Sequence, residues 1–195
     1  MKVKVCGITS LDDATMCEDE GIDALGFVHF PGRHRSLTLR EIGDICSTVG
    51  PLVTRVLICS PKGPREAMTM LERTGADVLQ TYSMPPMFLS RLRDHGVRVI
   101  RAVRPDEGEA RMYAESADAL VFEAGTPGTG HGYDYSRIPM DSCRRAIVAG
   151  GVTPENVDAV RALRPYGVDV SSGVESSPGV KDPVLVRALV RRCRA

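Results

Sequence analysis

Short apolar runs rich in Val, Ile and Leu recur along this chain and alternate with longer amphipathic stretches. The runs have the length and β-branched content of strands that are buried on both faces. They cover residues 2–7, 23–29, 52–59, 77–82, 98–103, 118–123, 146–149 and 167–171. The intervening stretches, such as 64–74, 86–95 and 107–116, have helical spacing. The pattern therefore predicts βα units around a parallel sheet.

Residues typical of helix starts support this alternation. Ser10 has an acidic residue three positions later, and Thr38 has a glutamate at the same distance, which is the pattern of a capping box. Thr153 and Asp182 each precede a proline, which suits the first position of a helix. We therefore expect helices to begin at these four places.

Eight strands, each followed by a helix, predict an α/β fold of the (βα)8 or TIM-barrel type, built as one domain over residues 1–195. A doubly wound open sheet is the alternative that the pattern leaves open. The chain has 195 residues, whereas such barrels usually need about 250. The stretch from Gly125 to Cys143 is rich in Gly and Pro and allows only a short helix around 135–143. We expect the missing length to come from a trimmed helical region between the sixth and seventh strands.

Charge and cysteine usage narrow the class of function. The 25 basic and 25 acidic residues balance, which makes a nucleic acid an unsuitable partner. We expect neither a membrane span nor a signal peptide, because no apolar run is long enough for a span and the first residues lack the apolar stretch of a signal peptide. The six cysteines and four histidines have no metal-ligand or disulfide spacing. We expect a cytoplasmic protein that uses no metal and no cofactor and that has neither nucleic acid nor membrane as a partner. Whether it is a monomer or a homodimer stays open.

Two loops near the end of the chain have the composition of an anion site. Gly150 and Gly151 follow the seventh predicted strand, and Ser171, Ser172 and Gly173 follow the eighth. Glycines let the backbone approach a ligand, and exposed N–H and hydroxyl groups bind anions. Consecutive strand ends are neighbours at the carboxyl face of a barrel, where phosphates are commonly bound. The loops predict a phosphorylated small molecule as ligand, although ordinary turn glycines remain an alternative.

Two other strand ends carry candidate acid–base groups. Cys6 ends the first strand and has the same parity as Lys4, so a nearby ammonium is expected to favour its thiolate. Glu123 follows four apolar residues at the end of the sixth strand, where partial burial would suit a general acid. The alternatives are a packed cysteine and a salt-bridged glutamate. Asp169, inside the eighth strand, and Arg35, after the second, are further polar candidates.

Several of these segments resemble the phosphoribosylanthranilate isomerases of tryptophan biosynthesis. The similar segments are Lys4–Thr9, Asp23–Val28, Gly128-Thr129-Gly130 with Asp134, Ala149–Asn156, Val168–Glu175 and Gly179–Asp182. The similarity extends over nearly the whole chain, and its first and last motifs are specific.

The resemblance implies a role for each matching position. Cys6 falls on the general base, Arg35 on the arginine that faces the anthranilate carboxylate, and Asp169 near the substrate's amino group. The phosphate-binding positions fall on Gly150, Gly151, Ser171, Ser172 and Gly173. Two positions depart from the family pattern: Glu123 stands where the general acid is usually Asp, and Tyr82 replaces a frequent histidine.

The resemblance implies an isomerase that catalyses an Amadori rearrangement of N-(5-phosphoribosyl)anthranilate without metal or redox cofactor. One alternative is another phosphate-binding barrel enzyme, such as a sugar-phosphate epimerase or a lyase of the same pathway. The other is a divergent paralogue that binds a phosphorylated ligand or a partner enzyme without turnover.

Overall fold

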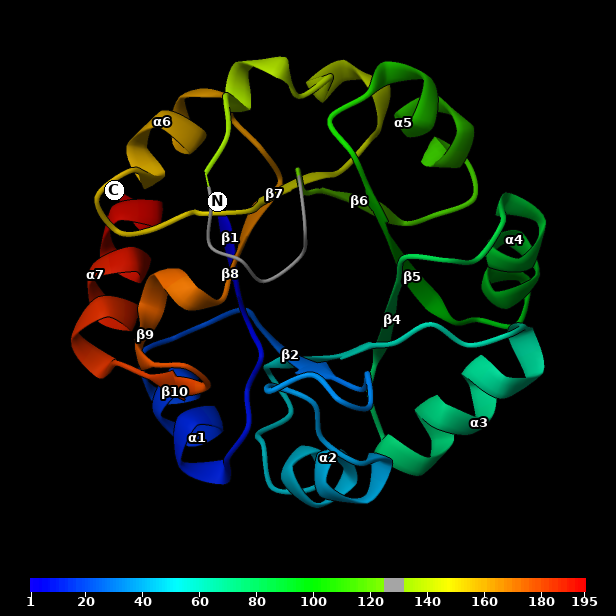
Figure 1. The fold of residues 1–195 in the computed structure, drawn as a ribbon, viewed down its shortest axis with the longest axis horizontal. Coiled ribbons are helices and arrows are strands. Elements are labelled where there is room, and N and C mark those ends of the chain that lie inside the picture. The colour runs from blue at the N-terminus through cyan, green and yellow to red at the C-terminus, as the bar shows by residue number, and fades with distance from the viewer. Residues whose placement is uncertain (125–131) are drawn as a thin grey trace.

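The computed structural model describes residues 1–124 and 132–195, and its parallel strands close into a barrel (Figure 1). The eight barrel strands are β1 (Lys2–Cys6), β2 (Ala24–Val28), β3 (Thr54–Ile58), β4 (Val78–Thr81), β5 (Arg98–Val103), β6 (Ala119–Phe122), β7 (Ala146–Ala149) and β8 (Gly167–Val170). The barrel closes where β8 pairs in parallel with β1, with Val168 opposite Val3 and Asp169 opposite Lys4. The predicted barrel is confirmed, and the open-sheet alternative is wrong.

Seven α-helices in the described part of the chain form a ring outside the barrel (Figure 1). They are α1 (Leu11–Asp19), α2 (Leu39–Cys46), α3 (Pro64–Thr74), α4 (Pro86–Asp94), α5 (Glu107–Ala114), α6 (Val157–Ala162) and α7 (Pro183–Arg194). Ser10, Thr38 and Asp182 cap α1, α2 and α7 as expected, and Thr38 forms the full capping box.

The expected helix start at Thr153 is wrong, because α6 begins four residues later. The side-chain oxygen of Asn156 accepts a hydrogen bond from the Thr153 N–H at 2.8 Å, and its amide donates to the carbonyl of Gly151. These contacts hold the residues between as turns and delay the helix.

Between β6 and β7 the described residues form two short 3₁₀ helices, η1 (Tyr135–Arg137) and η2 (Met140–Ser142). They replace the short helix expected around 135–143 and confirm that the helical region is trimmed there. The Gly128-Thr129-Gly130 segment of the family resemblance lies outside the described residues.

A small hairpin after β8 was not expected from the sequence. The chain passes through η3 (Ser172–Val174), pairs β9 (Glu175–Ser177) with β10 (Val180–Lys181) in antiparallel fashion, and enters α7. Thr9 donates its hydroxyl to the carbonyl of Gly179 at 2.7 Å, and Asp13 accepts from the Lys181 N–H at 3.2 Å. These bonds fix the hairpin against the segment that follows β1.

An aliphatic core lies between the strands and the ring of helices. Its largest fully buried side chains include Phe27, Leu57, Leu89, Phe122 and Leu189. These side chains come from β2, β3, α4, β6 and α7, so apolar packing holds both layers together all the way round the barrel. In the part of the chain that is described, none of the helices has the length and apolar character needed to cross a bilayer.

Candidate functional site

A cavity of about 390 Å³ opens at the carboxyl ends of the barrel strands. Barrel enzymes place their active sites at this face. The cavity brings together all nine residues that the sequence singled out. These are Cys6, Arg35, Glu123, Gly150, Gly151, Asp169, Ser171, Ser172 and Gly173.

Cys6 lies beside a buried ion pair at the cavity floor. The Lys4 ammonium lies 2.7 Å from Oδ2 of Asp169, and both side chains are buried. Burial lowers the pKa of Lys4, but Asp169 and Cys6 raise it by more, so this lysine stays charged. Lys4 was expected to bring the pKa of the Cys6 thiol below its usual range. Lys4 does lower the pKa of Cys6, but burial raises it by more, so the pKa of the thiol is raised.

Asp169 has one oxygen that the described residues leave unused. Oδ2 accepts the Lys4 hydrogen bond, whereas Oδ1 is buried and has no hydrogen-bond partner in residues 1–124 and 132–195. A buried acceptor without a partner is costly. A ligand N–H or O–H in the cavity would remove that cost, which makes Asp169 suited to bind a donor group.

Glu123 follows β6 directly and meets Tyr82 from the end of β4. The Tyr82 hydroxyl donates to Oε2 of Glu123 at 3.1 Å, and its ring packs edge-on against Phe30 at a centroid distance of 6.2 Å. Burial and the nearby charge of Glu123 raise the pKa of Tyr82, so the phenol remains a hydrogen-bond donor. Sequence reasoning noticed Tyr82 only as a departure from a family pattern, although its position at a strand end is the signal of a site residue.

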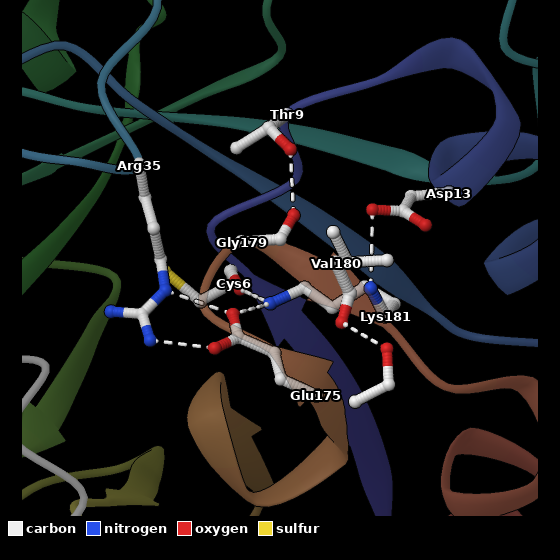
Figure 2. A network of polar contacts seen from close by, with 9 residues as sticks. Cys6, Thr9, Asp13, Arg35, Glu175, Gly179, Val180 and Lys181 are labelled. Carbon is white, nitrogen blue, oxygen red and sulfur yellow. Dashed lines mark hydrogen bonds and ion pairs between the residues drawn. The ribbon is translucent and has the colours of Figure 1, made fainter.

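Arg35 projects from the loop after β2 towards β9. Its Nε and Nη2 donate to the two carboxylate oxygens of Glu175 at 2.8 and 2.7 Å (Figure 2). Arg35 is therefore not a solvated loop residue. Glu175 also accepts from Lys181 at 2.7 Å. Burial raises the pKa of Glu175, but bonds from Arg35 and Lys181 outweigh it and lower the pKa to about 2.

The two glycine-rich loops meet as predicted. Gly150 and Gly151 have φ of 88° and 68°, a backbone conformation that side chains rarely adopt. A Cβ on Gly173 would lie 2.0 Å from the carbonyl oxygen of Val152. This close approach joins the loop after β7 to the loop after β8, and together they form one wall of the cavity.

The described residues hold no group of three or more His, Cys, Asp or Glu side chains placed to bind a metal ion. Among the described residues, a thiol, carboxylic acids, arginine side chains and glycine-rich loops line one cavity.

The family model and the relatives that match this chain carry the same family name. The family model described as N-(5'-phosphoribosyl)anthranilate (PRA) isomerase matches residues 3–192. A protein of that name from Nitrosococcus oceani is 38% identical over 200 residues, which cover 97% of this chain and 96% of the relative.

Solved structures agree with the sequence comparison. The phosphoribosyl anthranilate isomerase of Thermus thermophilus superimposes with a TM-score of 0.91 at 37% identity, covering 100% of this chain and 98% of that one. A second such isomerase was solved in complex with reduced 1-(o-carboxyphenylamino)-1-deoxyribulose 5-phosphate. It has a TM-score of 0.88 at 29% identity, with 100% and 98% coverage.

Proposed function

This chain belongs to the N-(5'-phosphoribosyl)anthranilate isomerase family, and on that premise we propose how its cavity performs the reaction. The protein is an isomerase of tryptophan biosynthesis. It converts N-(5-phosphoribosyl)anthranilate into 1-(2-carboxyphenylamino)-1-deoxyribulose 5-phosphate by an Amadori rearrangement, for which we assign Glu123 as general acid and Cys6 as general base. Residues 1–195 act as one catalytic domain.

The reaction needs one proton delivered and one removed. Glu123 protonates the furanose ring oxygen, so the bond from that oxygen to C1′ breaks and a protonated Schiff base forms. Cys6 in its thiolate form, which Lys4 favours against the effect of burial, then removes the C2′ proton to give an enolamine that tautomerises to the ketone. β1 and β6 lie on different sides of the closed barrel, so acid and base can act on opposite sides of the sugar. Each should contribute about 10²–10⁴-fold to the rate.

The other cavity residues bind the two ends of the substrate. The loops at Gly150-Gly151 and Ser171–Gly173 hold the phosphate with backbone N–H and hydroxyl groups. Arg35 faces the anthranilate carboxylate, and the unused Oδ1 of Asp169 accepts from the substrate's amino group. The enzyme works as a cytoplasmic monomer or homodimer, with this phosphorylated small molecule as its partner and no cofactor.

One observation supports the proposal most strongly. A thiol, a carboxyl group and two anion-suited loops, which lie far apart in the sequence, line a single cavity. Sugar-phosphate epimerases that depend on a metal need a ligand cluster of a kind that the described residues do not contain. A divergent, non-catalytic paralogue would not require the thiol and carboxyl group to face the same cavity.

The substrate is fluorescent, so the loss of its fluorescence on adding purified protein measures the reaction. The wild-type protein should remove the signal well above the spontaneous decay, whereas Cys6→Ala should not. Glu123→Gln should lose about 10²–10⁴-fold in kcat because it cannot donate a proton, and Glu123→Asp should retain most of the activity. A folded wild-type protein without turnover would favour the non-catalytic paralogue. Full activity in Cys6→Ala or Glu123→Gln would refute the role of that residue.

A further inference from the structure

The hairpin of β9 and β10 brings two buried charges to the site that the reaction scheme above does not use. Glu175 and Lys181 pair at 2.7 Å, and their side chains are 5% and 0% exposed. A buried ion pair adds little stability over an apolar pair of similar volume, because desolvation offsets most of the attraction, although removing one partner alone is costly. Stability alone therefore does not explain why these two charges are buried beside the site, and their contacts suggest a role there.

The first contact concerns the arginine proposed to recognise the substrate. Residues 31–34 of the loop that carries Arg35 are exposed, whereas the Arg35 side chain itself is only 11% exposed. Glu175 constrains the direction of the guanidinium, because its two oxygens bind Nε and Nη2 at once. A bidentate pair fixes the plane of a guanidinium as well as its position.

The second contact concerns the proposed base. The Lys181 ammonium donates to the backbone carbonyl of Cys6 at 2.8 Å while it also binds Glu175 (Figure 2). One carboxylate is thus connected to both the end of β1 and the loop after β2. The backbone that presents the thiol and the guanidinium that faces the ligand are held in one network.

The backbone geometry leaves little freedom in this network. Gly7 follows Cys6 with φ of 72°, and a Cβ there would lie 2.5 Å from Cδ of Arg35. The aliphatic part of Arg35 therefore lies directly over the turn that ends β1. The hairpin itself is bound to the same segment through Thr9 and Asp13.

We propose that Glu175, supported by Lys181, is a positioning residue that orients Arg35 for the carboxylate of the substrate's aromatic ring. This inference rests on the proposed function, and it makes Glu175 a determinant of the enzyme's specificity for a carboxylated ring. Glu175 acts through Arg35 and touches no reacting atom. A pre-oriented guanidinium binds without the loss of side-chain freedom that a mobile arginine would suffer.

The test compares the binding of two non-reacting ligands. One is reduced 1-(2-carboxyphenylamino)-1-deoxyribulose 5-phosphate, and the other is the same molecule without its carboxyl group. Glu175→Gln should weaken binding of the first about tenfold or more and leave the second within about threefold. Arg35→Met should do the same, and Glu175→Gln should add nothing further when combined with it, because both act on one interaction.

A matched control separates positioning from stability. Asp77 binds Nε and Nη2 of Arg55 at 2.8 and 2.7 Å, which is the same geometry, but near the amino ends of β3 and β4. Asp77→Asn should lower stability and leave the affinity for both ligands unchanged. If Glu175→Gln does not fold, Glu175→Asp keeps the charge and should show the same selective loss to a smaller extent.

Two results would overturn the inference. Equal weakening of both ligands by the Glu175 variants would make Glu175 structural only. Additive losses in the double variant would show that Glu175 does not act through Arg35. Turnover by the wild-type enzyme is measured alongside, so failure of the isomerase assignment, which would remove this inference as well, is recognised separately.

Discussion

The Tyr82 hydroxyl lies 3.1 Å from Oε2 of Glu123, so a residue at the end of β4 directly contacts the proposed acid at the end of β6. The two strands are separated by β5, and the contact therefore reaches across one strand of the barrel rim. Glu123 is one methylene longer than aspartate, so its carboxyl group can take more positions. The hydrogen bond from Tyr82 restricts them.

Removing that hydrogen bond gives the first prediction. Tyr82→Phe should lower kcat about tenfold with little change in KM, because the carboxyl group loses one hydrogen bond but the ligand-binding groups remain. Tyr82→His is the matched variant, since an imidazole N–H can also donate, and it should retain most of the activity. Steady-state kinetics on the three proteins measure this. An unaffected kcat in Tyr82→Phe would mean that the contact does not orient the acid.

The second prediction concerns the pH dependence of Cys6. Burial raises the pKa of this thiol, Lys4 lowers it and Asp169 raises it. The rate of alkylation by iodoacetamide, followed on the Cys6 peptide by mass spectrometry, should rise with pH and have its midpoint above the usual value of about 8.5. Lys4→Gln should move the midpoint higher, and Asp169→Asn should move it lower. A wild-type midpoint at or below 8.5 would contradict the dominance of burial.

The third prediction concerns stability as a function of pH. The pKa of Glu175 is lowered to about 2 in the folded protein, below the unfolded value of about 4.3. Its stabilisation is therefore complete at neutral pH and is lost as the pH falls from about 4.3 towards the folded value. Glu175→Gln should be less stable than wild type by about 3 kcal/mol at pH 7, and the difference should shrink on acidification.

Urea unfolding between pH 7 and pH 3 measures this difference. Glu72→Gln, on the exposed side of α3, removes the same charge from the surface and provides the control. It should change stability little at any pH, because surface charges contribute little. A Glu175→Gln difference that stays constant down to pH 3 would show that the carboxylate is not the stabilising form.

The fourth prediction concerns the contact between the two glycine loops. Gly173→Ala places a Cβ 2.0 Å from the backbone oxygen of Val152, so the loops must separate at a cost of about 1–3 kcal/mol or more. Competitive inhibition by inorganic phosphate should weaken in this variant. Gly63→Ala, whose nearest neighbour would be 4.0 Å away, is the control and should leave phosphate inhibition unchanged. Unaltered inhibition in Gly173→Ala would separate these loops from the phosphate site.

Local sequence signals predicted most of the fold. The helix expected over 64–74 coincides with α3, because a proline opens it and Gly75 ends it with φ of 63°. The start of α6 was predicted wrongly, since Asn156 competes for the backbone groups that would have begun the helix at Thr153. That competition depends on a side-chain geometry that composition alone does not reveal.

The sequence predicted those candidate site residues that lie at the ends of strands. Cys6 and Glu123 were singled out as candidates because barrel function gathers where strands finish, and both line the cavity. The partner of Arg35 was missed, since Glu175 lies 140 positions away and belongs to a hairpin with only a weak local pattern. Long-range ion pairs leave no periodic trace in a sequence, and only the folded structure shows which charged residues meet.

Closure of β1 onto β8 has a consequence for how the protein is made. Lys4 leaves the ribosome well before its carboxylate partner Asp169, which is synthesised 165 residues later. Until then the ammonium has no buried counter-ion and must remain in water, so β1 cannot reach its final environment before Asp169 is available. The surroundings of the Cys6 thiol are therefore completed only after Asp169 has been synthesised, and a nascent chain that stalls earlier carries the thiol without one of the groups that control its protonation.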